Sequence, residues 1–269
     1  DFAIKEDIGD GDHSALSCLD LTKRGTAKLL IKQEGVIAGI ALAKYLFTYI
    51  DPTAKVQVLI KDGSRVHPGD IALTVEANAV KLLQAERLVL NYTQRLSGVA
   101  TSSAEYSKMV AHTSTTILDT RKTTPGLRVL EKWAVSLGGG GNHRMGLYDM
   151  IMLKDNHIDF AGGIIPAVTS VREYLSDKQK SLKIEVETRD LQEVREALIA
   201  GVDRIMLDNF TTDDTRIAVA LIDRRAETES SGGITKDSLV SYAECGVDYI
   251  SVGALTHQIK SLDMSLKAI

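Results

Sequence analysis

The stretch Lys183–Asp208, KIEVETRDLQEVREALIAGVDRIMLD, decides the fold class of this chain. It begins with a short apolar run, continues with a segment whose apolar residues recur at helical spacing, and ends with a second apolar run. Gly201 follows the helical segment, at the position where a glycine commonly ends a helix. Two strands joined through a helix run parallel in one sheet. The stretch therefore predicts a unit of a parallel α/β sheet.

The same rhythm of strand, loop and helix extends from residue 113 to residue 259. Six short apolar runs carry it: Thr116–Leu118, Met150–Leu153, Lys183–Val186, Arg204–Leu207, Ala226–Thr228 and Tyr249–Val252. Helical segments lie between most of these runs, and their even spacing favours a barrel over an open doubly wound sheet. We therefore expect residues 113–259 to form an α/β barrel domain.

Residues 1–112 have a different, mixed α+β pattern. Strands are expected at Thr26–Gln33, Lys55–Ile60 and Ile71–Ala77, with a helix at Ala41–Ile50 and a long amphipathic helix from Asn78 that ends before Gly98. Residues 262–269 alternate apolar and polar side chains, which is typical of a strand. We expect the segment 260–269 to return to the N-terminal sheet and complete that domain.

The composition is that of an ordinary globular protein. Hydrophobic residues make up 44% of the 269 positions and charged residues 25%, and the net charge of −4 gives no reason to expect nucleic-acid binding. No stretch approaches the roughly 20 apolar residues that span a bilayer. The two cysteines, Cys18 and Cys245, are far apart, which argues against a disulfide framework or a zinc site. These features predict a cytoplasmic protein without a membrane partner.

Polar, charged or glycine residues follow all six predicted strands of the barrel. In a parallel barrel the carboxyl ends of the strands meet at one rim, where the active sites of such folds lie. The residues that follow the strands, in chain order, are Thr120, Arg121, Lys122, Lys154, Glu187, Asp208, Ser231, Gly232, Gly233 and Gly253. Solvation alone does not explain the pattern, because each helix already has a polar face of its own.

These residue types divide into three chemical groups. Arg121, Lys122, Arg144 and Lys154, with His143 nearby, offer positive charge for carboxylates and phosphates. Glu187 and Asp208 lie on neighbouring strands and suit Mg²⁺ or a developing cation. The glycines after the last two strands suit a phosphate, which barrels commonly bind on backbone N–H groups at that place.

Several other residues have a simpler structural interpretation. Lys132 is expected to be a solvated charge near a helix end, and His157 to be a packed or capping histidine. The run Gly138–Gly141 is expected to be a flexible linker, with Gly141 adding mobility. The helical pattern by itself makes Arg87 solvent-exposed.

Six segments carry a resemblance to a known family. DTRKTTPGLR at Asp119–Arg128, GGGGNHRMG at Gly138–Gly146 and MLKDNH at Met152–His157 are followed by RIMLDN at Arg204–Asn209, SSGGI at Ser230–Ile234 and DYISVGALTH at Asp248–His257. In this order they resemble quinolinate phosphoribosyltransferase, also known as nicotinate-nucleotide pyrophosphorylase (carboxylating). The resemblance covers nearly the whole chain, including ERLVLNYTQRLSGVAT at Glu86–Thr101.

The resemblance implies a fold and a reaction. The expected fold is an N-terminal α/β sandwich domain followed by an incomplete parallel α/β barrel, as in type II phosphoribosyltransferases. The expected enzyme converts quinolinate and phosphoribosyl pyrophosphate into nicotinate mononucleotide, pyrophosphate and CO₂, a step of NAD biosynthesis. It uses Mg²⁺ and forms a homodimer or a hexamer built from such dimers.

The resemblance also implies roles for individual residues. Lys154, Glu187 and Asp208 are the expected catalytic residues, and Glu187 and Asp208 the residues near Mg²⁺. Arg87 is expected to complete the site of the neighbouring subunit, which replaces its interpretation as a merely solvated residue. The remaining substrate contacts are expected from Thr120, Arg121, Lys122, His143, Arg144, Ser231, Gly232, Gly233 and Gly253.

Two other functions stay open at this point. A related phosphoribosyltransferase could act on nicotinate or another acid, although a monocarboxylate would leave buried cations unpaired at a desolvation cost. A non-catalytic phosphate-binding barrel would keep the glycine loops but would not need Glu187, Asp208 and the full set of cations together. Release of CO₂ from quinolinate separates the first alternative, and Mg²⁺-dependent turnover separates the second.

Overall fold

The computed structural model describes all residues from Asp1 to Ile269. It divides the chain into two compact units. The first unit holds Asp1–Ala104, Trp133–Gly139 and Gln258–Ile269, and the second holds Glu105–Lys132 and Gly140–His257. The N-terminal part of the first unit thus ends at Ala104, and two later segments join it. The domain division proposed from the sequence, at residue 112, stays a prediction.

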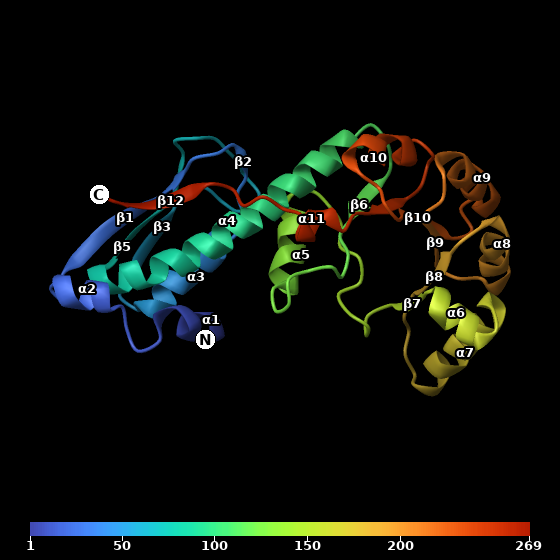
Figure 1. Ribbon diagram of the computed structural model, residues 1–269, viewed down its shortest axis with the longest axis horizontal. Helices are drawn as coiled ribbons and strands as arrows, with labels where there is room; N and C mark the ends of the chain where they lie inside the picture. The colour runs from blue at the N-terminus through green and yellow to red at the C-terminus, as the bar shows by residue number, and fades with distance from the viewer. The chain divides into compact units, whose positions relative to one another are not determined.

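The first unit is built on a four-stranded antiparallel sheet in the order β12-β1-β5-β3. Its strands are β1 (Arg24–Ile31), β3 (Lys55–Val58), β5 (Ile71–Asn78) and β12 (Met264–Ala268), and β2 (Gly35–Val36) and β4 (Arg65–Val66) pair separately. Its helices are α1 (Phe2–Ile8), α2 (His13–Cys18), α3 (Ile40–Ile50) and most of α4 (Ala79–Met109). β12 pairs with β1 from Ala27–Ala268 to Ile31–Met264, so the C-terminal segment lies at an edge of this sheet (Figure 1).

The core of the first unit lies between its sheet and the helices α3 and α4. Alternate residues of the strands, such as Leu29 and Ile31 on β1, are fully buried against Phe47 of α3 and Val89 of α4. This alternation is what a sheet with one covered face requires. The sequence pattern therefore located the core strands correctly.

The long helix α4 differs from the prediction at Gly98. The sequence predicted a helix end there, but α4 continues without a break to Met109. The C-terminal segment crosses the helix at Gly98, where an added Cβ would lie 2.4 Å from the carbonyl oxygen of Lys260. Glycine is therefore needed for close approach of the backbone and not for a turn.

The second unit is built on a six-stranded parallel sheet in the order β6-β11-β10-β9-β8-β7. Its strands are β6 (Thr116–Leu118), β7 (Ile151–Leu153), β8 (Ile184–Thr188), β9 (Arg204–Asp208), β10 (Glu227–Ser231) and β11 (Tyr249–Ser251). All six strands match the predicted runs to within a few residues, with the largest difference at β10. β6 and β7 are edge strands, so the sheet is an incomplete barrel.

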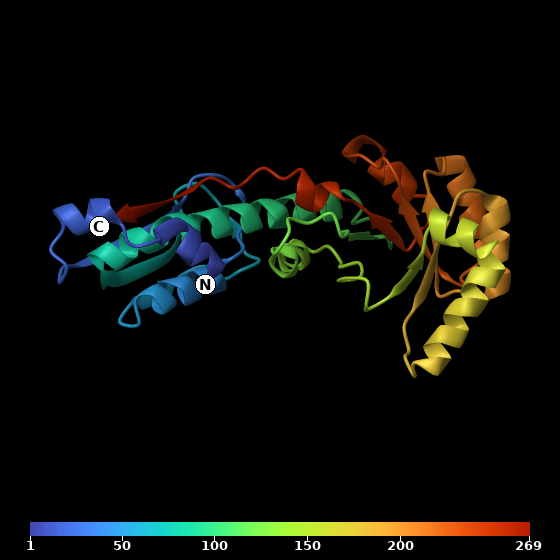
Figure 2. The ribbon, with the colours of Figure 1, turned by 60° about the horizontal axis from the view of Figure 1, so that its bottom comes forward.

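Helices cover the outer face of this sheet. They are α6 (Asp155–Ala161), α7 (Ile164–Asp177), α8 (Leu191–Ala200), α9 (Thr212–Ile222) and α10 (Lys236–Ala243). The short helix α11 (Ala254–His257) follows β11, and α5 (Arg128–Leu137) lies between β6 and β7 in the chain. In both ribbon views the helices α6 to α9, yellow to orange, stand together on one side of β7 to β10 (Figures 1 and 2). The other face is left for side chains that point inward. No helix of the chain combines the length and apolar character that a membrane span requires.

Candidate active site

The strand register decides which side chains share the inner face of the second sheet. Met152 of β7 pairs with Glu185 of β8, and Glu187 of β8 pairs with Met206 of β9. Side chains paired in register point to the same face, and so do residues two positions along a strand. Glu187 and Asp208 therefore lie on one face at the carboxyl ends of adjacent strands, as the sequence predicted. Ser231, in register with Asp208, joins them from β10.

Lys154 and Glu187 form a direct ion pair at the carboxyl ends of the strands, which we call the edge of the second sheet. Lys154 follows β7 at the level of Glu187, and its Nζ lies 2.5 Å from Oε2 of Glu187. The lysine side chain is 45% exposed and the glutamate side chain 12%. The pair is therefore open to solvent on the lysine side, where an anion could approach.

Asp208 lies next to the glycine loop that follows β10. Its Oδ2 accepts a hydrogen bond of 2.7 Å from the side-chain amide of Asn209. Gly232 has φ +92°, and an added Cβ would lie 2.2 Å from Oδ1 of Asn209. Only glycine fits this position, both for its backbone conformation and for its space. The SSGGI loop therefore passes close to Asn209, whose backbone N–H donates to the carbonyl oxygen of Ser231 at 2.9 Å.

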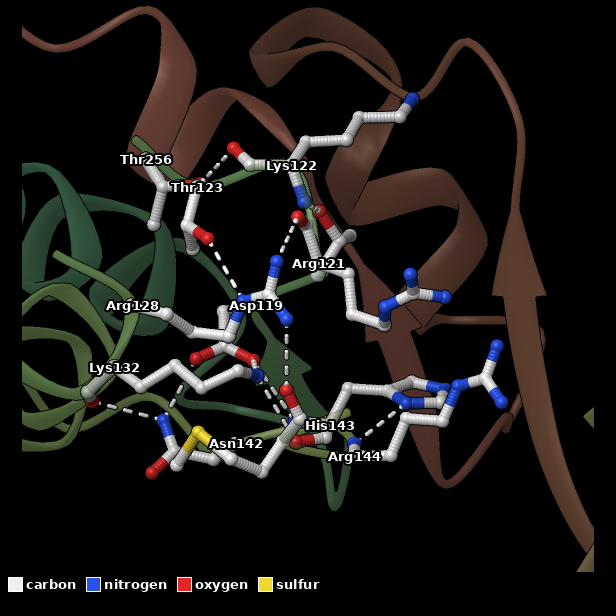
Figure 3. Close-up of polar contacts among 12 residues, drawn as sticks. Asp119, Arg121, Lys122, Thr123, Arg128, Lys132, Asn142, His143, Arg144 and Thr256 are labelled. Atoms are coloured by element: carbon white, nitrogen blue, oxygen red, sulfur yellow. Dashed lines mark hydrogen bonds and ion pairs between the residues drawn. The ribbon is translucent and has the colours of Figure 1, made fainter. Parts of the chain in front are cut away.

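Arg121 and Arg144 lie on two basic loops, residues 119–127 after β6 and 142–150 before β7, and their side chains extend to the same side (Figure 3). The pKa of Arg144 is lowered by its partial burial and by the nearby charge of Arg121. The Nη1 atom of Arg144 donates to the carbonyl oxygen of Met150 at 3.3 Å, and Arg121 forms no ion pair. Two neighbouring guanidinium groups repel each other and together create a positive potential that suits an anion.

A buried ion pair beneath the basic loops joins them to each other. Lys132 of α5 contacts Asp119, and its Nζ also donates to the carbonyl oxygen of His143 at 3.0 Å (Figure 3). Asp119 accepts further hydrogen bonds from the backbone N–H of His143 at 2.9 Å and from the side chain of Asn142 at 2.7 Å. Burial raises the pKa of Asp119, while these donors act to lower it. The interpretation of Lys132 as a solvated charge was wrong, because this lysine is only 1% exposed.

Arg128, one turn before Lys132 on α5, holds the same loops from a second point. Its Nε donates to Oγ1 of Thr123 at 2.9 Å, and its Nη2 and Nη1 donate to the carbonyl oxygens of Arg121 and Met145 at 3.3 and 3.2 Å. One guanidinium thus connects the DTRK and NHRM segments (Figure 3). Two cations of α5, Arg128 and Lys132, thus hold the two loops together.

Lys122 and Thr120 lie toward the last strand of the sheet. The Thr120 hydroxyl accepts a hydrogen bond from the backbone N–H of Lys122 at 3.1 Å, so it shapes the turn. The carbonyl oxygen of Lys122 accepts from Thr256 at 2.9 Å. An added Cβ on Gly253 would lie 3.1 Å from Cδ of Lys122, so this glycine leaves room for the lysine stem.

His143 differs from the other predicted contacts, because it is buried and points inward. Its Nε2 lies 3.1 Å from Oε2 of Glu185 and 3.5 Å from Oε2 of Glu229. The Nη1 of Arg204 donates to Oε2 of Glu229 at 2.9 Å. One donor atom each from His143, Glu185 and Glu229 lie within 4.8 Å of one another, a spacing that would permit a metal ion. The imidazole thus faces acidic groups of its own chain.

The buried acids shift the ionisation of this cluster. Burial and the charge of Glu185 raise the pKa of Glu229 to about 7, against the lowering by His143 and Arg204. Burial lowers the pKa of His143, but the two glutamates outweigh it and the net direction is upward. Burial likewise opposes the charge of Arg204, whose pKa is nevertheless raised because its acidic partners prevail.

His157 and Gly141 both have structural roles. His157 caps α6, since its Nδ1 accepts the backbone N–H of Lys154 at 3.1 Å, and the capping interpretation is confirmed. Gly141 is not part of a free linker. It donates to the carbonyl oxygen of Ile117 at 2.8 Å and accepts from the N–H of Asp119 at 3.2 Å, so it extends the sheet beside β6.

The second unit therefore brings together most of the predicted site residues, and Arg87 lies outside it. Arg87 is exposed on the part of α4 that belongs to the first unit. The sequence reasoning missed Asp119, Arg128, Glu185 and Glu229, and misjudged Lys132. A charged residue inside a buried strand was the available signal for Glu185, which lies two positions before Glu187. Glu229 was not recognised as a strand residue because the predicted strand ended at Thr228, whereas β10 continues to Ser231.

The fold places the chain in a class before its sequence relatives are considered. A solved structure of human nicotinic acid phosphoribosyltransferase matches 95% of this chain and 72% of its own with a TM-score of 0.68 at 13% sequence identity. At that identity the likeness shows the fold alone. The fold is that of the type II phosphoribosyltransferases, a class that the family match to quinolinate phosphoribosyl transferase supports.

Sequence comparison gives the family. Residues 12–97 match the N-terminal domain and residues 99–267 the C-terminal domain of quinolinate phosphoribosyl transferase. The chloroplastic nicotinate-nucleotide pyrophosphorylase (carboxylating) of Arabidopsis thaliana is 46% identical over 99% of this chain and 80% of its own length. The probable enzyme of that name from Bacillus subtilis is 44% identical over 97% and 89%. A solved nicotinate-nucleotide pyrophosphorylase from Francisella tularensis covers 100% of this chain and 94% of its own at 38% identity and a TM-score of 0.94.

The chain belongs to the quinolinate phosphoribosyltransferase family. It is accordingly a decarboxylating phosphoribosyltransferase of NAD biosynthesis.

Proposed function

We propose that the edge of the second sheet binds quinolinate and phosphoribosyl pyrophosphate together and joins the ring nitrogen of the first to the sugar of the second. The pair of neighbouring guanidinium groups, Arg121 and Arg144, supports this most directly. Quinolinate carries two adjacent carboxylates, and a planar carboxylate suits the forked donors of arginine. A monocarboxylate would leave part of this charge without a partner.

The sugar phosphate would lie on the other side of the edge, over β8 to β11. Ser231, Gly232 and Gly233 would bind the 5′-phosphate through hydroxyl and backbone N–H groups, with Gly253 opposite. Lys122 and Lys154 would stabilise the negative charge of the leaving pyrophosphate. Glu187 fixes the position of Lys154 through the 2.5 Å ion pair.

The donor set fits Mg²⁺ at Glu187 and Asp208. Both residues offer carboxylate oxygens, which this hard cation prefers, on adjacent strands and one face. Mg²⁺ bound there would supply positive charge that stabilises the leaving pyrophosphate. Glu187 and Asp208 would also stabilise the positive charge that develops on the ribose carbon as its bond to pyrophosphate breaks.

Decarboxylation needs little from the protein beyond the fixed substrate. Once the nitrogen is ribosylated, the positive ring accepts the electron pair of the bond that links C2 to its carboxylate. CO₂ leaves and a proton is taken up at C2. A dry site favours the neutral product CO₂ over the charged carboxylate.

Arg87 would act from a second subunit. We propose a homodimer, or a hexamer built from such dimers, in which Arg87 of one chain supplies a further cation to the carboxylate site of its neighbour. Mixing inactive Arg87→Ala and Lys154→Ala subunits tests this arrangement, because one site of each mixed dimer regains both groups. Recovery of activity is expected, and no recovery despite demonstrated subunit exchange would contradict it.

We also propose a cytoplasmic location, supported by two free cysteines and the lack of a disulfide. Several plant relatives are named chloroplastic or mitochondrial. Fractionation of the source cells with an antibody to the chain tests the proposal, and recovery of the chain in an organelle fraction would contradict it.

The reaction itself is tested with quinolinate and phosphoribosyl pyrophosphate, with and without Mg²⁺. Nicotinate mononucleotide and CO₂ from the labelled 2-carboxylate are expected in equal amounts, and only with Mg²⁺. Turnover of nicotinate without release of CO₂ from quinolinate would favour a monocarboxylate enzyme instead. Binding of phosphoribosyl pyrophosphate without any turnover would favour a phosphate-binding protein.

A further inference from the structure

The buried layer beneath the basic loops holds more charge than folding alone explains. Glu185 and Glu229 are both 0% exposed, and Glu185 has one ion-pair partner, His143. Neither oxygen of Glu185 accepts a well-directed hydrogen bond from the protein. Burying a carboxylate in this way costs several kcal/mol, and apolar residues of similar size would commonly suit a fold better. These acids therefore call for a function beyond packing.

The two ring nitrogens of His143 face different kinds of partner. The Nδ1 atom accepts the backbone N–H of Arg144 at 2.7 Å. Nε2 lies 3.1 and 3.5 Å from carboxylate oxygens of Glu185 and Glu229, as ion-pair contacts and not as a well-directed hydrogen bond. A backbone N–H can only donate, so in the neutral ring Nδ1 carries the lone pair and the proton lies on Nε2. The acids below and the amide above thus select one tautomer and one ring orientation.

The same ring controls the backbone that carries Arg144. His143 and Arg144 are consecutive, and Nδ1 ties the amide between them to the imidazole. On the other side, Lys132 and Asp119 hold the carbonyl oxygen and the N–H of His143. The direction in which the Arg144 guanidinium leaves the loop is therefore set by groups that lie below the edge of the sheet.

We propose that Glu185 and Glu229 are positioning residues that, through the Nε2–H tautomer of His143, orient Arg144 toward the carboxylates of the substrate. Arg204 completes the layer, since it bonds Glu229 and lies 4.1 Å from the centre of the Tyr249 ring. His143 is in this view a support for the diacid site and not a contact of the substrate. The inference deepens the proposed function and rests on it.

A metal ion fits the same three groups less well than this arrangement. To bind a metal, Nε2 must lose its proton, and the neutral ring would then carry the proton on Nδ1. That proton would point at the N–H of Arg144 only 2.7 Å away. The guanidinium of Arg204 already occupies an oxygen of Glu229 at 2.9 Å. The cluster is therefore built around a hydrogen on Nε2.

Steady-state kinetics of three variants test the proposal. Glu185→Gln and Glu229→Gln should each raise KM for quinolinate by about 10-fold, an effect typical of residues that orient a histidine from behind, while KM for phosphoribosyl pyrophosphate changes little. Glu227→Gln is the matched control, because Glu227 lies on the same face of β10 and bonds Arg204 but does not contact His143. It should leave both KM values within about twofold, the range expected of a substitution that breaks no contact in the site.

A double-mutant cycle tests whether the acids act through His143. The combination of Glu229→Gln with His143→Ala should raise KM for quinolinate no more than His143→Ala alone, since residues in one network are not additive. Additive effects would overturn the proposal. So would Gln variants at 185 and 229 that match the Glu227→Gln control while His143→Ala is strongly impaired, because His143 would then act by itself.

Nitrogen-15 NMR of the wild-type ring gives a test that needs no variant. The proposal requires a protonated Nε2 and an unprotonated Nδ1 in the neutral ring, measured at a pH above the raised pKa of His143, with both signals nearly unmoved on addition of quinolinate. The opposite tautomer, or a large shift of Nε2 with quinolinate, would overturn it. If wild-type protein binds and turns over no quinolinate, the proposed function fails instead, and the tautomer still reports on the buried layer.

Discussion

Two layers of the same strands contrast with each other in the second unit. Glu187 on β8 and Asp208 on β9 stand at the carboxyl ends, partly exposed, and Glu187 has a lysine partner that reaches solvent. Glu185 lies two residues earlier on β8 and Glu229 lies on β10, and both are fully buried beside His143 and Arg204. In the upper layer, formed by Lys154, Glu187 and Asp208, charged groups reach solvent and can contact a ligand. In the lower layer, the charged groups of His143, Glu185, Glu229 and Arg204 contact one another.

This difference separates chemistry from support. Charged groups at the edge can contact the substrate, so their loss should lower turnover more than it lowers the free energy of unfolding. Charges below the edge are desolvated and depend on one another, so their loss should change stability, or the position of a neighbour, more than the chemical step. The buried pair of Asp119 and Lys132 under the basic loops belongs with the lower layer in this respect.

The largest effect is expected from Lys132→Ala. Removing one partner of a buried ion pair leaves Asp119 charged without its cation, which typically costs about 3–5 kcal/mol. Urea unfolding of the variant measures the loss. Lys122→Ala is the control, because it removes an exposed lysine from the loop that carries Asp119. It should change the free energy of unfolding by less than about 0.5 kcal/mol. Equal stabilities for the two variants would contradict the assignment of Lys132 to the buried layer.

Next in size is the loss of turnover in Lys154→Ala. The removal of one preorganised charge at a transition state typically costs about 10²–10³ in rate, or about 2.7–4 kcal/mol. We expect kcat for quinolinate to fall by that factor, while urea unfolding stays close to wild type because the lysine is half exposed. Arg121→Ala should give a loss of the same order. Near-normal turnover in both variants would remove them from the site.

Glu229→Gln should change the pH dependence of stability. The folded-state pKa of about 7 lies above the ordinary value of 4.5, so the folded protein holds an extra proton between these values. Unfolding releases this proton in that window, so the stability of the wild type falls progressively as pH rises from about 4.5 to 7, by at most about 3 kcal/mol. The variant lacks this loss, so its stability relative to wild type should rise across that window and level off above it. A difference that is flat with pH would show that Glu229 is ionised throughout.

The smallest effect is expected from Arg189→Ala. Arg189 forms ion pairs with Asp159 and Glu193 at 3.0 and 2.6 Å, but its side chain is 49% exposed. Exposed pairs of this kind contribute little, since water and salt screen them. Thermal unfolding should show no measurable change at 0.15 M salt. A clear drop in the midpoint would mean that ion pairs outside the buried layer also support the sheet.

The upper layer was predictable from the sequence, and the lower layer largely was not. Strand ends can be read from apolar runs, so Lys154, Glu187 and Asp208 were placed by counting along the chain. Lys132 and Asp119 meet through tertiary packing of α5, which no spacing reveals, and the lysine was misread as solvated. His143 was assigned to the substrate by resemblance, whereas its ring direction depends on Glu185 and Glu229 from distant strands. Gly98 shows the same limit, because the carbonyl oxygen of Lys260, 162 residues later in the chain, passes too close to admit a side chain.

A crystal structure of the chain with quinolinate bound tests the separation of the two layers most directly. We predict that the carboxylates of quinolinate contact Arg121 and Arg144, while Nε2 of His143 stays beside Glu185 and Glu229. A carboxylate bonded to Nε2 of His143, or quinolinate bound away from the carboxyl ends of the strands, would contradict the account.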